Sequence, residues 1–307
     1  MKKFPALLAV LPLVALLAAC GSTAAKDNDK PRVVASFYPF AYVAEQVGGS
    51  FVDVDNLTSP GAEPHDLELK PKQVAAVQEA DLVVYEKHFQ AAVDEAVDQA
   101  DRPKDSTVDA DTVLNALPAQ AGAQEEGGHE GEEGDEDPHT WLDPTNMVLM
   151  AEDLSAKLSK VDPEHSSTYR ANTDRLVAQL ETLDTSFAAG LKTCERRTIV
   201  TSHAAFQYMA KRYDLTQVPI AGIDPTNEPS PAQLGDITQL VRKEGITTIF
   251  TEELVSPAIA DTIAKEAGAM TATLDPIEGL SNDTSSENYL TLMEKNLTTL
   301  EKANSCS

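Results

Sequence analysis

The sequence predicts an α/β fold built from two lobes, each with a mostly parallel sheet. From Arg32 onward, short β-branched runs alternate with amphipathic helical patterns, which is the order of elements expected for parallel sheets. One long helical pattern over residues 161–190 interrupts this alternation, which then resumes. A chain of 307 residues is also long enough for one large or two medium domains. We therefore predict a first lobe over residues 32–160, a linking helix over 161–190 and a second lobe over 191–307.

The elements of the first lobe follow from apolar spacing and from residues that stop helices. One helix is indicated by apolar residues at helical spacing and two glycines that end it: Phe40, Val43, Ala44 and Val47, then Gly48 and Gly49. The other expected elements are strands at 33–37, 51–57 and 80–85, a loop at 61–67, and helices at 71–79 and 147–158. Residues 119–138 have glycine and acids but no apolar period, which predicts a mobile acidic surface loop.

The linking helix has a start signal and one continuous apolar face. Asp162, Pro163 and Glu164 suit an N-cap, a first-turn proline and a first-turn acid. The apolar face consists of five residues spaced by whole helical turns: Tyr169, Leu176, Leu180, Leu183 and Phe187. At 1.5 Å per residue this helix is on the order of 40 Å long, which is enough to join two lobes.

The second lobe repeats the alternation of the first. Strands are expected at 198–202, 218–223, 246–251 and 270–274, and one helix is expected to begin at residues 228–231. Two amphipathic helices are indicated by their apolar faces: Phe206, Met209, Ala210 and Tyr213, then Leu290, Met293, Leu297 and Leu300. The last helix brings Cys306 back towards the body of the lobe.

The N-terminus has the features of an export signal. Residues 1–19 contain two lysines, a short apolar run and small residues before Cys20. The four residues that end at Cys20 resemble a bacterial lipobox, which implies cleavage before Cys20 and lipidation of its thiol; the alternative is a plain signal peptide. We expect residues 20–31 to be a disordered tether and the protein to be extracytoplasmic and anchored to the cell membrane.

The net charge disfavours some classes of partner, and the cysteine content indicates a disulfide. Removing Lys2 and Lys3 with the signal changes the formal net charge from −26 to −28, which disfavours nucleic acid and anionic membranes and attracts cations. Apart from Cys20, only Cys194 and Cys306 remain, and they have no CxxC spacing. In an exported protein such a pair predicts a disulfide rather than a redox site.

Four side chains that follow a predicted strand, or lie in the loop beyond one, have the chemistry of metal ligands. They are His65 in GAEPHDLELKP, His139 in DPHTWLDP, His203 in TSHAAF and Asp275 in TLDPIEGL. Ligands in open α/β sheets collect at the carboxyl ends of strands, and these four are divided equally between the lobes. A single histidine after a strand is more often structural, so the prediction depends on their combination. Three imidazoles and one carboxylate favour zinc, while manganese prefers a larger share of carboxylates.

Several neighbours of these residues are expected to support or replace a ligand. Asp66 and Asp143 are predicted to orient imidazoles through the second ring nitrogen. Glu63 or Glu252 could supply the oxygen ligand in place of Asp275. Trp141, the only tryptophan, is predicted to pack as a wall of the site.

Together, these motifs resemble the solute-binding lipoproteins of zinc and manganese ABC importers, often called cluster 9 or cluster A-I. The resemblance spans the mature chain, and the paired GxxPHD-like and DPHxWLDP motifs are specific to it. It implies two lobes joined rigidly by a long helix, a membrane permease as partner, and metal ligands at His65, His139, His203 and Asp275. A histidine in TSHAAF, where manganese-selective members tend to have a carboxylate, implies zinc. We also expect a monomer.

The acidic loop departs from the family pattern. Zinc members often have a histidine-rich loop at this place, whereas here the loop contains one histidine among acids: His129, Glu130, Glu132 and Glu133. Two interpretations remain open, a low-affinity cation collector and a solvated charge run. Carboxylates without imidazoles hold zinc poorly, which favours the second.

Capture of extracytoplasmic zinc for a permease is the leading functional prediction, and we expect no enzymatic activity. The alternatives are a manganese-binding homologue, a secreted zinc metalloenzyme and a surface adhesin. Three histidines on zinc also describe a hydrolytic centre, but a fourth protein ligand would leave no position for activated water. The adhesin alternative rests only on the lipid anchor and predicts no dependence on the histidines.

Overall fold

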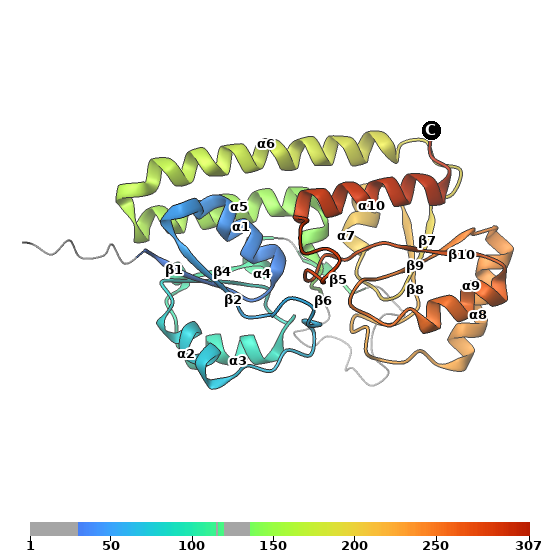
Figure 1. Cartoon of the computed structure of the whole chain (residues 1–307), viewed down its shortest axis with the longest axis horizontal. Helices are drawn as coiled ribbons and strands as arrows, with labels where there is room; N and C mark the ends of the chain where they lie inside the picture. The colour runs from blue at the N-terminus through green and yellow to red at the C-terminus, as the bar shows by residue number, and fades with distance from the viewer. Residues whose placement is uncertain (1–29, 115, 120–135) are drawn as a thin grey trace, which may run out of the picture.

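A computed structural model describes residues 30–114, 116–119 and 136–307 of the chain. It has two α/β lobes, each with a four-stranded sheet, which confirms the predicted fold class (Figure 1). The strand orders are β2-β1-β3-β4 in the first lobe and β10-β9-β7-β8 in the second. Every strand pair in these two sheets is parallel, so in each sheet the carboxyl ends of the strands lie at one edge.

The first lobe contains the predicted elements and several short ones that were not predicted. Its sheet is formed by β1 (Arg32–Ala35), β2 (Asp53–Asn56), β3 (Leu82–Tyr85) and β4 (Thr107–Asp109). Its helices are α1 (Tyr38–Gly48), α2 (Pro71–Glu79), α3 (Ala91–Gln99), α4 (Ala110–Val113) and α5 (Pro144–Val161). The helix at 71–79 has the predicted bounds, whereas α4 and β4, with four and three residues, were missed because they are too short for a clear apolar period.

The second lobe follows the predicted alternation. Its strands are β7 (Thr198–Thr201), β8 (Thr216–Pro219), β9 (Thr248–Thr251) and β10 (Met270–Thr273). Its helices are α7 (Gln207–Arg212), α8 (Pro231–Glu244), α9 (Ala258–Ala267) and α10 (Tyr289–Asn304). Ser230 caps α8 by accepting a hydrogen bond from the backbone N–H of Gln233, and Pro231 occupies the first turn, where its missing N–H costs nothing.

One long helix, α6 (Ser166–Gly190), extends along both lobes (Figure 1). The 3-10 turn η4 (Pro163–His165) precedes α6. The predicted start residues therefore begin this turn, and α6 follows it directly. The predicted apolar face of α6 is buried, and it packs on α1 and α5 of the first lobe and on α10 of the second. Since α6 contacts helices of both lobes, it joins them along its length as well as through its ends.

The hydrophobic core is shared between the lobes on the helical side. One cluster of buried side chains includes residues of α1, α5, α6, α7 and α10. Two smaller clusters lie within single lobes, one around Val83 in the first and one around Ile249 in the second. Separating the lobes on the α6 side would expose apolar surface of the shared cluster, so this side resists opening.

The disulfide between Cys194 and Cys306 is present, as predicted. It ties the segment that follows α6 to the C-terminus, and the two cysteines also form an isolated antiparallel bridge. The Arg196 N–H donates to the carbonyl of Asn304 beside it.

Some predicted features lie outside the described residues. These are the signal peptide, Cys20 and most of the tether, together with His129, Glu130, Glu132 and Glu133 of the acidic loop. The predicted end of that loop at residue 138 is wrong, because β6 (Glu136–Asp137) pairs with β5 (Leu117–Pro118) and Asp137 is buried. Among the described helices, none is both long enough and apolar enough to cross a bilayer.

Candidate metal centre

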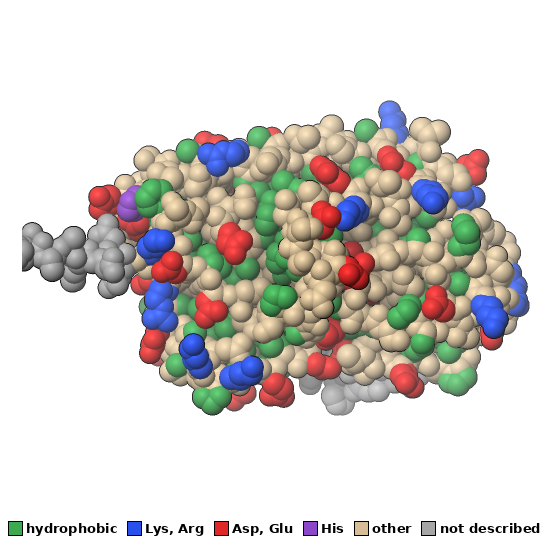
Figure 2. Space-filling view, viewed as in Figure 1, with side chains coloured by type: hydrophobic (Ala, Val, Ile, Leu, Met, Phe, Trp, Pro, Cys, Tyr) green, Lys and Arg blue, Asp and Glu red, His purple; other side chains and the backbone are tan. Residues whose placement is uncertain are grey.

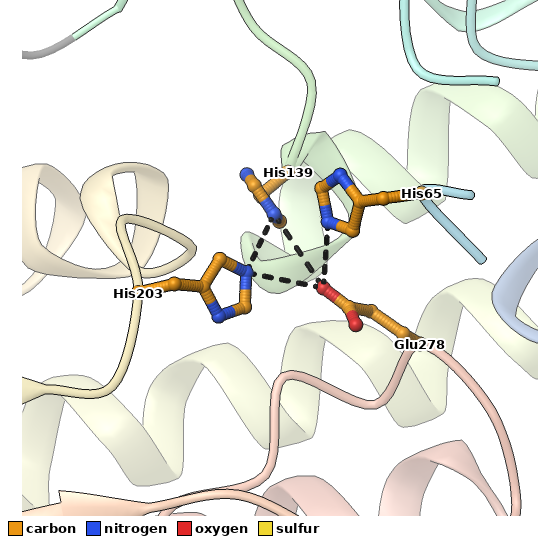
Figure 3. A group of neighbouring side chains, drawn as sticks. All are labelled: His65, His139, His203 and Glu278. Atoms are coloured by element: carbon orange, nitrogen blue, oxygen red, sulfur yellow. Dashed lines mark hydrogen bonds and ion pairs between the residues drawn. The ribbon is translucent and has the colours of Figure 1, made fainter. Parts of the chain in front are cut away.

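Three histidines and one glutamate from four separate segments converge between the lobes. His65 lies between β2 and α2, His139 precedes the 3-10 turn η3 (Thr140–Leu142), His203 follows β7, and Glu278 lies between β10 and α10. Figure 3 shows the four side chains pointing towards one another, and one potential ligand atom from each lies within 4.8 Å of the others. The predicted histidines therefore meet, two from the first lobe and one from the second.

Four of the six distances between these donor atoms are close to the edge of a tetrahedron around zinc, and all six are within 4.8 Å. Glu278 Oε1 lies 3.4 Å from the Nε2 of His65, 3.5 Å from that of His139 and 3.3 Å from that of His203. The Nε2 atoms of His139 and His203 are 3.1 Å apart. Donors about 2.0–2.1 Å from a tetrahedral zinc lie about 3.3–3.4 Å from each other. The four donors are thus spaced to contact one small cation at the same time.

The four side chains of the cluster are almost completely buried. The side chains of His139 and His203 are 0% exposed, that of Glu278 is 1% exposed and that of His65 is 6% exposed. On the face drawn in Figure 2, no histidine side chain is visible over the junction of the lobes. A cation held here would be shielded from water, so its contacts with the four donors would be strong.

Two buried carboxylates orient the imidazoles. Asp137 Oδ1 lies 2.7 Å from Nδ1 of His139 and also accepts its backbone N–H. Glu252 Oε1 is placed in the same way, 2.8 Å from Nδ1 of His203, and accepts that backbone N–H as well. A carboxylate at Nδ1 leaves Nε2 as the free donor and increases its basicity, which is the usual support for a metal-bound histidine.

The charges of the cluster are strongly coupled. Burial alone favours neutral Glu278, but hydrogen bonds with the three histidines outweigh it and hold the pKa of Glu278 well below its ordinary value. Burial lowers the pKa of His203, yet Glu252 and Glu278 outweigh burial and raise that pKa well above the ordinary value. The pKa of His139 is raised for the same reason, by Asp137 and Glu278 against burial. The buried carboxylates thus favour the protonated forms of His139 and His203, and these imidazoles favour the ionised form of Glu278.

Each of these carboxylates keeps one oxygen without a hydrogen-bond partner among the described residues. The atoms are Glu278 Oε2, Asp137 Oδ2 and Glu252 Oε2, and all three are buried. Buried acceptors are costly when nothing pairs with them. A divalent cation at the centre of the cluster would bind Glu278 directly and offset the negative charge of the other two.

The predicted oxygen ligand, Asp275, is not a member of the cluster. Its Oδ1 accepts the backbone N–H of Ile277, and its own backbone forms two hydrogen bonds with the side chain of Asn296. Burial raises the pKa of Asp275 to about 7 despite the hydrogen bond from Ile277. The carboxylate that reaches the histidines is Glu278, three residues later in the same LDPIEGL motif. The motif identified the segment but not which of its two acids points inward.

The residues predicted to orient an imidazole or to replace the oxygen ligand have other roles in the structure. Asp143 caps α5 by accepting the N–H of Thr145, and among the described residues it has no contact with an imidazole. Asp66 is exposed, and Glu63 accepts the backbone N–H groups of His65 and Asp66 instead of joining the cluster. Glu252 orients His203, as described above.

Trp141 lies against the cluster. It is fully buried, with its ring centroid 5.2 Å from that of His139. Phe89 contacts the other first-lobe histidine, with its ring centroid 4.6 Å from that of His65. The two aromatic rings form an apolar wall on the first-lobe side.

A model of one protein family matches residues 33–303 of this chain. The family is described as "Zinc-uptake complex component A periplasmic". The chain belongs to this family. Membership confirms the resemblance that the motifs indicated.

Two relatives illustrate how the family varies in length. The chain is 38% identical to the zinc-binding lipoprotein AdcA of Streptococcus pneumoniae over 309 aligned positions, covering 98% of this chain and 61% of that protein. It is 34% identical to the high-affinity zinc uptake system protein ZnuA of Bacillus subtilis, covering 98% of this chain and 97% of that protein. The chain therefore spans about three fifths of the streptococcal relative and nearly all of the other.

Solved structures show the same fold. The Zn(II)-bound ZnuA-like domain of Streptococcus pneumoniae AdcA superposes with a TM-score of 0.74 at 36% identity, covering 90% of this chain and 99% of that domain. The laminin-binding protein Lmb of Streptococcus agalactiae gives a TM-score of 0.77 at 33% identity, covering 89% of this chain and 99% of that protein. Lmb is described as bifunctional, with adhesin and metal-transporting activity.

Proposed function

We propose that this protein captures extracytoplasmic Zn²⁺ between its lobes and delivers it to a membrane ABC permease. The ligands are His65, His139, His203 and Glu278. The observation that carries the proposal is the convergence of three imidazoles and one carboxylate within 4.8 Å of one another, with Glu278 Oε1 3.3–3.5 Å from each Nε2. Lipidation of Cys20 would hold the protein at the outer side of the membrane, close to its permease.

The donor set favours zinc over manganese. It has three imidazole nitrogens and one carboxylate, whereas manganese sites take a larger share of oxygen ligands. The divalent affinity order also places zinc well above manganese at nitrogen donors. The zinc-bound state of a relative with the same fold supports this choice.

A closed ligand shell supports capture rather than hydrolysis. Catalytic zinc sites use three protein ligands and keep a fourth position for water. Here Glu278 occupies that fourth position, and its side chain is 1% exposed. A zinc ion held by all four residues would have no site for an activated water molecule.

Metal analysis tests the proposal directly. Protein purified without chelators should contain one zinc ion per chain, and chelator-stripped protein should take up one equivalent of zinc in preference to manganese. The measurement is elemental analysis together with competitive titration. A stripped protein that binds neither metal would overturn the proposal, and a preference for manganese would overturn its zinc assignment.

Zinc affinity should rise with pH. The pKa values of His139 and His203 are raised in the metal-free protein, so these imidazoles hold protons above the ordinary histidine pKa of about 6.5. Zinc must displace those protons, and each displaced proton changes the affinity about tenfold per pH unit. The pKa of Glu278 is lowered, so this residue stays ionised and adds little to the dependence. Titrations between about pH 5 and 8 should show a steep rise, and a flat profile would contradict the site.

The carboxylates behind the histidines should matter without touching the metal. Asp137→Asn and Glu252→Gln should each weaken zinc binding about 10- to 100-fold, because each removes the charge that supports one imidazole. Asp143→Asn is the matched control, since asparagine caps a helix as well as aspartate and Asp143 contacts none of His65, His139 and His203. Equal affinities for all three variants in chelator competition would contradict the assigned roles.

A further inference from the structure

The segment that carries Glu278 is held on both sides by loops of the first lobe. The Trp141 Nε1–H donates to the carbonyl of Pro276 over 2.6 Å. The backbone N–H of Gly61 donates to the carbonyl of Leu280 over 2.8 Å. These carbonyls lie two residues before and two residues after Glu278. The first lobe therefore holds the second-lobe segment by one hydrogen bond on each side of Glu278.

Both donors belong to the loops that carry the first-lobe histidines. Trp141 comes two residues after His139, and Gly61 comes four residues before His65. Gly61 has a φ of +80°, a conformation that favours glycine, and it turns the loop so that its N–H meets the second lobe. Each first-lobe imidazole thus lies in a loop that has its own hydrogen bond to the Glu278 segment.

A second-lobe hydroxyl completes the contact at Trp141. The Tyr289 O–H, at the start of α10, donates to the Trp141 carbonyl over 2.6 Å. Both side chains are fully buried. Trp141 is therefore bound to the second lobe through its indole N–H and through its backbone carbonyl.

The Glu278 segment is itself stiff where it is gripped. Asn296 of α10 forms two hydrogen bonds with the backbone of Asp275, and Asp275 accepts the N–H of Ile277. Ile277 is β-branched and has a φ of +60°, a strained conformation that persists only when its surroundings enforce it. Because the segment is rigid, a displacement of Pro276 or Leu280 also displaces the Glu278 carboxylate.

We propose that the hydrogen bonds from Gly61, Trp141 and Tyr289 form a clasp that closes the lobes around the captured cation and sets its rate of release. The inference rests on the proposed zinc capture and adds positioning residues to it. The shared core resists opening along α6, so the lobes separate first at the loops that bear the ligands. Opening there breaks the clasp and withdraws Glu278 from His65 and His139 in one motion.

The rate of zinc release tests the clasp. Zinc-loaded mature protein is mixed with excess EDTA, and release is followed by stopped flow with a zinc-responsive dye. Tyr289→Phe removes one clasp hydrogen bond and should accelerate release about 2- to 10-fold. Trp141→Phe removes another together with some packing and should accelerate it further. Tyr169→Phe is the matched control, because this buried hydroxyl donates to Asp162 at the start of the linking helix, outside the clasp.

A second measurement separates the clasp from ordinary stabilisation. The rise in unfolding temperature on adding zinc should shrink in Tyr289→Phe and stay at the wild-type value in Tyr169→Phe. Wild-type release rates in both clasp variants, or equal acceleration by the control, would overturn the clasp and leave zinc capture standing. A wild-type protein that binds no zinc would overturn both.

Discussion

Replacing Glu278 with glutamine should reduce the affinity for zinc by more than about 100-fold, beyond the effect expected for a supporting residue. Among the described residues, Glu278 is the charged oxygen donor that faces all three imidazoles, and its Oε1 lies 3.3–3.5 Å from each Nε2. A neutral amide oxygen fills the same volume without the charge that balances a divalent cation. The affinity is measured by competition with a chelator of known strength at constant pH.

Asp275→Asn is the matched control for that substitution. Asp275 lies in the same motif and is also buried, but it accepts a backbone N–H and does not face the imidazoles. Asparagine can still accept that hydrogen bond, so the zinc affinity should stay within a few-fold of wild type. The reverse result, with Asp275→Asn losing zinc and Glu278→Gln retaining it, would restore the ligand first expected from the sequence.

Removing the disulfide should reduce the free energy of unfolding by about 2–5 kcal/mol. The bond joins Cys194 to Cys306 across 112 residues, so it closes a long loop of the unfolded chain. Cys306 is the residue before the C-terminus, and Figure 1 shows the C-terminus near the end of α6, away from the lobe junction. The double variant Cys194→Ser, Cys306→Ser should therefore unfold at lower denaturant concentration while binding one zinc ion at 25 °C.

Denaturant unfolding of the wild type with and without reductant provides the control for the serine substitutions. The reduced wild type should resemble the double variant, since both lack the cross-link. Coincident unfolding curves for the oxidised and reduced wild type would show that the bond adds no stability. Loss of zinc stoichiometry in the folded double variant would show that it also supports the metal centre.

The sequence by itself determined the elements and the location of the site. Apolar periodicity and terminal residues predicted α2, α6 and α10 and seven of the eight strands in the two parallel sheets, because local spacing decides which face of an element is buried. The sequence predicted that His65, His139 and His203 meet, because each follows a predicted strand or lies in the loop beyond one and ligands collect at the carboxyl ends of strands in open α/β sheets. The strand that was missed, β4, has only three residues.

Only the tertiary structure decided which carboxylates serve the histidines. Asp275 and Glu278 share one motif, and the turn at Ile277, enforced by Asn296 from a distant helix, directs Glu278 inward. Likewise, the sequence suggested that Asp143 orients His139, whereas Asp137, which is even closer to it in sequence, and Glu252 are the residues that reach the ring nitrogens. The direction of a side chain in an irregular loop depends on hydrogen bonds from segments far away along the chain. Local sequence patterns cannot predict those contacts.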